Sequence, residues 1–190
     1  MRLLILLFAT SSAFGATLDL SKATSKVEFL AIGKPSLLKI RGVAKQDGEK
    51  KPLEGALKVE GDSVKGEAKF EMATLETGIA LRDRHMKEKY LETAKFPKGE
   101  FKFSEMKLPA ALKNGDGKAS DVPFKGTLTV HGVPQPVEGK AKVEKKGSQI
   151  QFEFAFGTKI PAFNMGVPSF MGVTVAEDVQ VTVAVEGPLA

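Results

Sequence analysis

The side chains best suited to chemistry gather in one stretch, Thr77–Pro97. Arg82, Asp83 and His85 stand almost side by side there, and Tyr90, the only tyrosine of the chain, follows them. A histidine beside a carboxylate and a guanidinium can move a proton, so these side chains are candidates for an enzyme-like polar site. The alternative is structural, because ion pairs and capped helices use the same residue types.

The rest of the sequence offers few partners for a catalytic role. It contains no cysteine, which excludes thiol chemistry, and no serine occupies a G-x-S-x-G motif. The second histidine, His131, follows His85 by 46 residues (131 − 85) without a recognised zinc-ligand spacing. His131 ends a predicted strand, where a hydrogen-bonded loop histidine is the simpler interpretation. We therefore expect no metal site, no cofactor and no enzyme activity.

The same stretch predicts a short helix. Asp83 is a suitable N-cap for a helix from Arg84 to about Leu91. Met86, Tyr90 and Leu91 share one apolar face of that helix, so it is expected to pack against other apolar residues.

On both sides of this stretch, apolar and polar residues alternate. In the cleanest run, Val64–Met72, the apolar residues and Gly66 fall on one face and Lys and Glu residues on the other. Similar runs recur at fairly regular spacing and predict about eight antiparallel strands in an all-β domain. A sandwich and a barrel both fit, and the mid-strand glycines Gly66, Gly126 and Gly139 favour a bent, closed barrel. Such a barrel holds only its own side chains or one small apolar ligand.

Two long connections interrupt the strands. One begins with a turn at Asn114–Gly117 and runs as a polar loop to Pro123. The other, Gly157–Asp178, carries no charge between Lys159 and Glu177 and is rich in Phe, Met, Pro and Gly. It predicts an apolar loop that either makes contacts at the surface or packs inward as core.

The N-terminal sequence predicts an export signal. Residues 1–15 combine Arg2, an apolar run and a small-residue cleavage site, as in a secretory signal peptide. The remaining residues, 16–190, fit one domain with a net charge of about +4 (+5 less Arg2). Its lysines alternate with glutamates, so no basic stripe for nucleic acid forms. No second apolar run is long enough to span a bilayer.

Several of these pieces together resemble the YceI-like family. The resemblance extends roughly from Leu18 to Gly187 and rests on Thr77-Gly, Arg82–Met86, Tyr90-Leu91, Phe96-Pro97, Phe101–Phe103, Phe124–Val137 and Val173–Val185. It implies a lipocalin-like, eight-stranded antiparallel barrel with a short helical insertion, exported to the periplasm. It also implies a carrier of long polyisoprenoid or quinone-type molecules, held in the apolar interior.

The resemblance and the alternation together assign a lipid site. The expected lining residues are Phe101, Phe103, Leu128, Val130, Phe152, Phe154 and Phe156. The mouth is assigned to Phe163, Met165, Phe170 and Met171, and Met86 and Tyr90 are expected to face inward from the helix.

Three hypotheses follow from the sequence. The first is a non-catalytic periplasmic carrier whose partner is an apolar lipid, as a monomer or a homodimer. The second is an enzyme-like site at Arg82, Asp83 and His85. The third is a barrel filled by its own phenylalanines, which acts on a protein partner through its surface.

Overall fold

The structure is a computed structural model that describes residues 15–35, 37–44, 52–113, 115–170 and 172–190. Residues 1–14 of the expected signal peptide, Asn114 and Met171 lie outside these ranges, as does the side chain of Phe170. None of the helices in the described part of the chain is long and apolar enough to cross a membrane.

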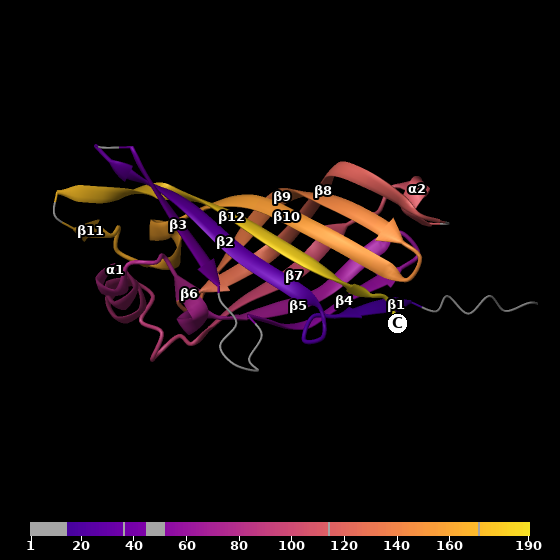
Figure 1. The fold of residues 1–190 in the computed structure, drawn as a ribbon, viewed down its shortest axis with the longest axis horizontal. Coiled ribbons are helices and arrows are strands. Elements are labelled where there is room, and N and C mark those ends of the chain that lie inside the picture. Colours follow the sequence, from indigo (N-terminus) through magenta and orange to yellow (C-terminus); the bar gives the residue numbers. More distant parts are fainter. Residues whose placement is uncertain (1–14, 36, 45–51, 114, 171) are drawn as a thin grey trace, which may run out of the picture.

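The described chain is almost entirely β-structure (Figure 1). Its strands are β1 (Ala16–Asp19), β2 (Thr24–Lys34), β3 (Leu38–Ala44), β4 (Leu53–Glu60), β5 (Ser63–Glu71), β6 (Leu75–Glu76), β7 (Lys98–Met106), β8 (Gly117–Val130), β9 (Val133–Lys146), β10 (Gln149–Lys159), β11 (Ser169–Phe170) and β12 (Val173–Pro188). The helical elements are η1 (Met72–Thr74), α1 (Ala80–His85), the π-helical turn η2 (Met86–Tyr90), α2 (Ala110–Lys113) and η3 (Ile160–Phe163).

All the strands belong to one antiparallel sheet, which curls into an incomplete barrel. Eleven strands follow one hydrogen-bonded path, β1-β4-β5-β7-β8-β9-β10-β12-β2-β3-β6, and β11 pairs with β12 beside it. The curl brings β1 to the end of the chain, where Thr17 and Ala190 exchange two backbone hydrogen bonds of 2.7 and 3.0 Å. The prediction of an all-β antiparallel fold with a short helix is confirmed.

The predicted count of eight strands is wrong. The alternation begins only at Ser25, but the short strand β1 lies before it, and the chain turns at Leu20–Ala23 between β1 and β2. The strands β6 and β11 have two residues each, too few to show alternation. The hydrogen-bonded path ends at β1 and β6, and in the described residues β1 meets the C-terminal end of the chain only through Thr17, Leu18, Leu189 and Ala190, so the sheet is curled rather than fully closed.

The long connections are shorter than the sequence suggested. Strand β8 begins at Gly117, inside the stretch expected as a polar loop. Most of the expected apolar loop Gly157–Asp178 is also structured, because it contains η3, β11 and the first residues of β12. Helix α1 begins at Ala80 with Ile79 as its N-cap, so Asp83 is not the cap.

Glycines allow the sheet to curl in two ways, by bending the backbone and by making room for a side chain inside the sheet. Gly66 in β5 has φ of 140°, and a Cβ there would lie 2.1 Å from the carbonyl oxygen of Ala56 on β4. Gly126 in β8 instead makes room inside the sheet, since a Cβ would lie 2.3 Å from Cζ of Phe101. The first position bends the backbone, and the second admits an aromatic ring.

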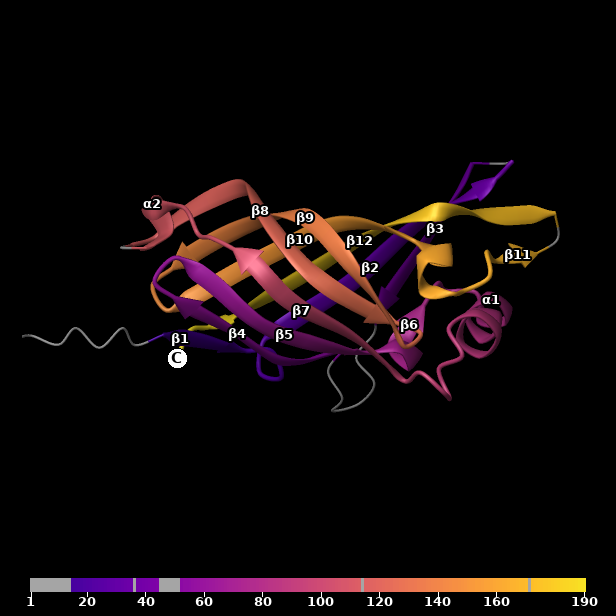
Figure 2. The ribbon, with the colours of Figure 1, turned by 180° about the vertical axis from the view of Figure 1, so that it is seen from behind.

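The curled sheet has two unlike ends, seen from both sides in Figures 1 and 2. At the packed end, beside β1 and α2, the side chains are fully buried: Leu18, Leu57, Val64, Met106, Leu112, Val143, Ile150 and Phe152. At the other end lie α1, β6 and β11. We call this the hollow end, because the interior next to it contains a cavity.

Candidate functional site

The cavity lies inside the curl of the sheet. It has a volume of about 160 Å³, and the surface that faces it is apolar. Seven of the long strands contribute to its wall: β2, β4, β5, β7, β8, β10 and β12. An apolar space of this size is large enough for a benzene-sized group.

The structure places six of the expected lining residues at the cavity. They are Phe101, Phe103, Leu128, Val130, Phe154 and Phe156. Phe152 does not border it, because it is fully buried behind Phe154, on which its ring stacks with centroids 5.4 Å apart. Phe152 therefore belongs to the packed end.

The other expected site residues lie away from the described cavity wall. Phe163 is buried in η3, and Met165 follows it, half-buried. Met86 packs against the core without bordering the cavity. The hydroxyl of Tyr90 accepts a hydrogen bond of 3.2 Å from the Ser169 backbone N–H, so Tyr90 fastens η2 to β11.

Sequence reasoning missed most of the residues that line the cavity. On β5, Ala68 and Phe70 face the cavity, and on β12, Val181, Val183 and Val185 do so. Alternation places the residues of each strand on one apolar face, so the sequence could have predicted that they line the cavity. Leu20, Met72 and Leu75 lie beside turns or in η1, where alternation gives no signal.

A cluster of phenylalanines forms one side of the cavity wall. Phe124 is its centre, with ring centroids 5.3 Å from Phe154 and 6.0 Å from both Phe101 and Phe103. The Phe124–Phe154 and Phe124–Phe101 pairs are edge-to-face, a favourable aromatic geometry. These rings form a rigid floor under the cavity.

Above the cavity at the hollow end lies the helical segment, Thr77–Pro97. Two of its charged side chains hold Thr77: the Asp83 carboxylate accepts from the Thr77 backbone N–H at 2.7 Å and from its hydroxyl. Arg82 Nε donates to the same hydroxyl at 2.7 Å, and a second guanidinium nitrogen donates to the Thr77 carbonyl at 2.9 Å. Arg82 and Asp83 therefore fix the chain as it enters α1.

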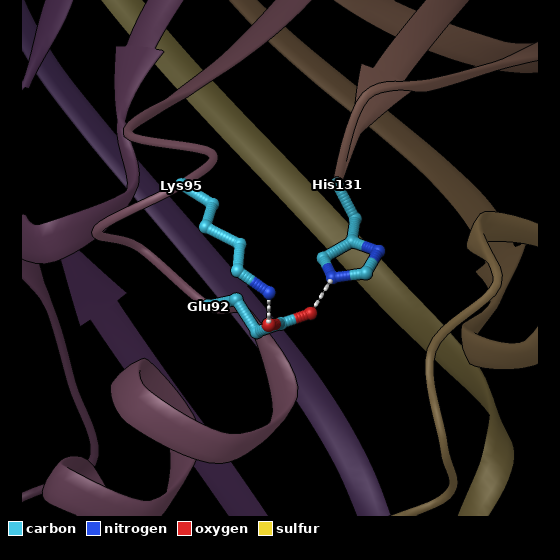
Figure 3. Close-up of polar contacts among 3 residues, drawn as sticks. All are labelled: Glu92, Lys95 and His131. Carbon is cyan, nitrogen blue, oxygen red and sulfur yellow. Dashed lines mark hydrogen bonds and ion pairs between the residues drawn. The ribbon is translucent and has the colours of Figure 1, made fainter.

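A second polar contact holds the other end of the helical segment (Figure 3). His131, at the turn between β8 and β9, lies with Nε2 2.7 Å from Oε2 of Glu92. Since an ionised carboxylate only accepts hydrogen bonds, the histidine donates. Lys95 Nζ lies 2.6 Å from the other carboxylate oxygen, and the Phe96 ring packs on His131 with centroids 4.2 Å apart. Glu92 and His131 are both left-handed, with φ of 45° and 53°.

The same contact shifts the ionisation of Glu92. Hydrogen bonds from Lys95 and then from His131 hold the pKa of Glu92 below its ordinary value of 4.5. His131 is thus a hydrogen-bonded turn residue that joins the β8–β9 turn to the helical segment. Within the described ranges, no group of three or more histidine, cysteine or acidic side chains is placed to hold a metal ion.

Comparison with known families matches residues 18–187 to the model of the YceI-like domain. The chain belongs to the YceI-like family. This confirms the resemblance seen in the helical segment and in the strands that follow it.

Relatives of this YceI-like chain include UPF0312 proteins of enterobacteria. A protein from Yersinia pestis (strain Pestoides F) is 31% identical over 121 residues, which cover 60% of this chain and 57% of the relative. One from Serratia proteamaculans is 30% identical over 120 residues, with the same coverage. The matched region thus spans little more than half the length of these relatives.

Solved structures show the same YceI-like fold. BcnA from Burkholderia cenocepacia superposes with a TM-score of 0.68 at 21% identity, over 90% of this chain and 99% of BcnA. A polyisoprenoid-binding domain from Saccharophagus degradans superposes with a TM-score of 0.66 at 14% identity, over 93% and 98% of the two chains. At these identities the likeness establishes the fold.

Proposed function

We propose that this YceI-like chain is a non-catalytic carrier that binds one end of a long isoprenoid-type lipid, polyprenyl or quinone-like, in its cavity. The observation that carries the proposal is the cavity itself, an apolar space of about 160 Å³ inside an otherwise packed sheet. A folded chain gains stability by filling such a space, since each lost contact costs dispersion energy. An apolar space that the protein's own side chains leave unfilled is therefore suited to an apolar ligand.

Binding then needs no charged contact. Each CH₂ group moved from water into the cavity contributes about 0.8 kcal/mol. The branched methyl groups of an isoprenoid would contact the phenylalanine floor and the valines of β12. Because the volume admits only a benzene-sized portion, the rest of a long chain would lie along the hollow end or require the helical segment to shift.

The comparisons support an isoprenoid-type lipid as the class of ligand, but they do not identify the ligand of this chain. One solved structure of this fold is described as a polyisoprenoid-binding domain. The signal peptide expected in residues 1–15 supports a periplasmic location for the proposed carrier.

The alternative of an enzyme-like site finds less support in the geometry. Arg82 and Asp83, two of its three side chains, already hold Thr77. A His85→Ala variant separates the two hypotheses. Loss of a pH-dependent activity with fold and lipid binding intact would favour an enzyme, whereas a lower Tm alone would favour a structural role. The alternative of a completely filled barrel does not fit the cavity.

Solvent extraction tests the carrier directly. The protein, purified without strong detergent, is extracted with organic solvent, and the extract is analysed by mass spectrometry. We expect a polyprenyl or quinone-type lipid, and we expect the extracted protein to take up added solanesol. An empty extract together with no uptake of solanesol would contradict the proposal.

A further inference from the structure

The large apolar side chains that the described surface exposes lie on two elements. Leu37, in the turn of the β2–β3 hairpin, and Leu38, the first residue of β3, are 71% and 49% exposed. Ile79 and Leu81, at the start of α1, are 54% and 41% exposed. Exposed apolar side chains gathered in this way usually mark a contact surface.

Both elements project from the hollow end, as Figures 1 and 2 show from opposite sides. A series of contacts connects them. Gly33, which pairs with Leu38, also pairs with Val175 of β12. The start of β12 pairs with β11, and β11 is bonded through Ser169 to Tyr90, in the turn that continues α1. The four apolar residues thus belong to one end of the molecule.

Basic residues flank each apolar pair. The hairpin carries Lys34 and Lys39, both exposed, and no acidic residue occurs between Gly33 and Ala44. On the helical side, Arg84 and Lys89 are exposed, and residues 80–90 carry four basic and two acidic side chains. The segment between them, residues 160–175, carries no charge. This end therefore combines apolar tips with a positive rim.

We propose that the hollow end docks on the surface of an anionic lipid bilayer. Leu37, Leu38, Ile79 and Leu81 enter the interface, and the flanking lysines and arginines face the phosphate headgroups. Two separate apolar projections with basic neighbours suit a bilayer, where burial of apolar tips adds to attraction by anionic lipid. The packed end has no exposed large apolar side chain among its described residues.

This inference rests on the proposed function and deepens it, because it names where lipid would be exchanged. Leu75 and Val130 border the cavity and stand just before Thr77 and His131, which hold the helical segment. Docking at this end would bring the cavity and the helical segment to the membrane.

Vesicle binding and lipid content are separate measurements, so the two proposals can fail independently. A protein that carries lipid but ignores vesicles overturns this inference alone, and one that binds vesicles but carries no lipid overturns the proposed function alone.

A single introduced tryptophan tests which end docks, since the chain contains none of its own. Leu38→Trp places the probe at the hollow end, and Ala110→Trp, at an exposed position in α2, is the matched control at the packed end. Vesicles of phosphatidylglycerol and phosphatidylcholine should shift the emission of Leu38→Trp to the blue and leave that of Ala110→Trp unchanged. Equal shifts, or no shift in Leu38→Trp, would overturn the inference.

Co-sedimentation of the otherwise native protein with the same vesicles gives the affinities. Lys39→Glu with Arg84→Glu should lower binding at least about tenfold, since each basic residue near an anionic surface contributes about fivefold. Leu37→Ser with Leu81→Ser should lower it by a similar factor, and phosphatidylcholine alone should bind weakly. Lys107→Glu with Lys146→Glu makes the same charge change near the packed end and should leave binding within about twofold.

Two results would contradict docking on a bilayer. Equal loss in the packed-end control would show that only net charge matters. A concentration-dependent dimer that Leu37→Ser with Leu81→Ser abolishes, without vesicle binding, would show that the surface joins two copies of the chain.

Discussion

The packed end and the hollow end are built from the same strands, yet they bury their apolar residues to different degrees. On β10, Ile150 and Phe152 at the packed end are 1% and 0% exposed, whereas β7 carries half-buried Phe101 and Phe103 around the cavity. Helix α2 covers the packed end with the buried side chain of Leu112. The hollow end is instead covered by the helical segment, which polar contacts hold in place.

This difference indicates that the two ends of the sheet have different roles, one in stability and the other in holding an open space. Dense packing at one end supplies stability, because interiors are close-packed and lost volume is costly. The other end can keep an open space because the phenylalanine floor and the packed end already hold the strands together. Matched substitutions at the two ends should therefore have unlike effects.

The largest effect is expected from removing a phenylalanine ring. Phe152→Ala should lower the free energy of unfolding by about 3–5 kcal/mol, because the ring is fully buried. Phe101→Ala, at the cavity wall, should cost about half as much, because its ring already faces empty space. Urea denaturation of delipidated protein measures both. Equal costs would mean that the two ends do not differ in packing.

Adding volume should also cost more at the packed end than at the cavity. Ala141→Leu, at a fully buried position of β9, should cost about 1–3 kcal/mol through overpacking. Ala68→Leu places the same atoms into the cavity and should cost less than about 1 kcal/mol. It should also reduce uptake of solanesol, which Ala141→Leu should leave unchanged once the protein is folded. Undiminished uptake by Ala68→Leu would place the ligand elsewhere.

Thr77 tests how the helical segment is held. Thr77→Val removes the hydroxyl that Arg82 and Asp83 share and should cost about 1–2 kcal/mol. Thr77→Ser keeps the hydroxyl and should remain within about 0.5 kcal/mol of the wild type. Hydrogen exchange should show the loss mainly in residues 77–97. A loss spread evenly over the sheet would show that this segment is not a separate unit.

The smallest expected effect depends on pH. A carboxylate whose pKa is lowered by folding stabilises the fold above its unfolded pKa, and this contribution is lost as the pH falls through the folded pKa. Glu92 is such a group, with an ordinary value of 4.5. The Tm of wild type should exceed that of Glu92→Gln by a few degrees at most at pH 7, and the difference should vanish as the pH falls below 4.5.

Lys95→Met is the matched variant for this measurement. It removes the hydrogen bond that lowers the pKa of Glu92 most, so the pH-dependent loss should be smaller and should be complete closer to pH 4.5. A Tm difference between wild type and Glu92→Gln that stays constant down to low pH would show that the Glu92 charge does not hold the helical segment.

The fold class was predictable because alternation is a strong signal in long strands. The run Val64–Met72 predicted which face of β5 is apolar, and the motifs of the helical segment identified the family. The strand count was not predictable. Strands β6 and β11 arise where the chain happens to meet β3 and β12, which no local pattern encodes.

The residues of the cavity wall that lie in the middle of strands, such as Phe101 and Phe156, were predictable from alternation. Wall residues that lie in or beside turns were not, because alternation does not extend to them. The helical face was assigned from a period of 3.6 residues, which placed Met86 and Tyr90 together. The chain instead forms a π-helical turn, with Leu91 N–H bonded to the Met86 carbonyl at 2.9 Å. This wider turn changes the direction of Tyr90, whose hydroxyl reaches β11.

Native mass spectrometry of gently purified protein tests the central claim most directly. Wild type should carry an added mass that solvent extraction identifies as a polyprenyl or quinone-type lipid. Ala68→Leu, with the cavity partly filled, should carry less of it while losing less than about 1 kcal/mol of stability. Protein that is free of lipid in every preparation, and that takes up no solanesol after delipidation, would contradict the account.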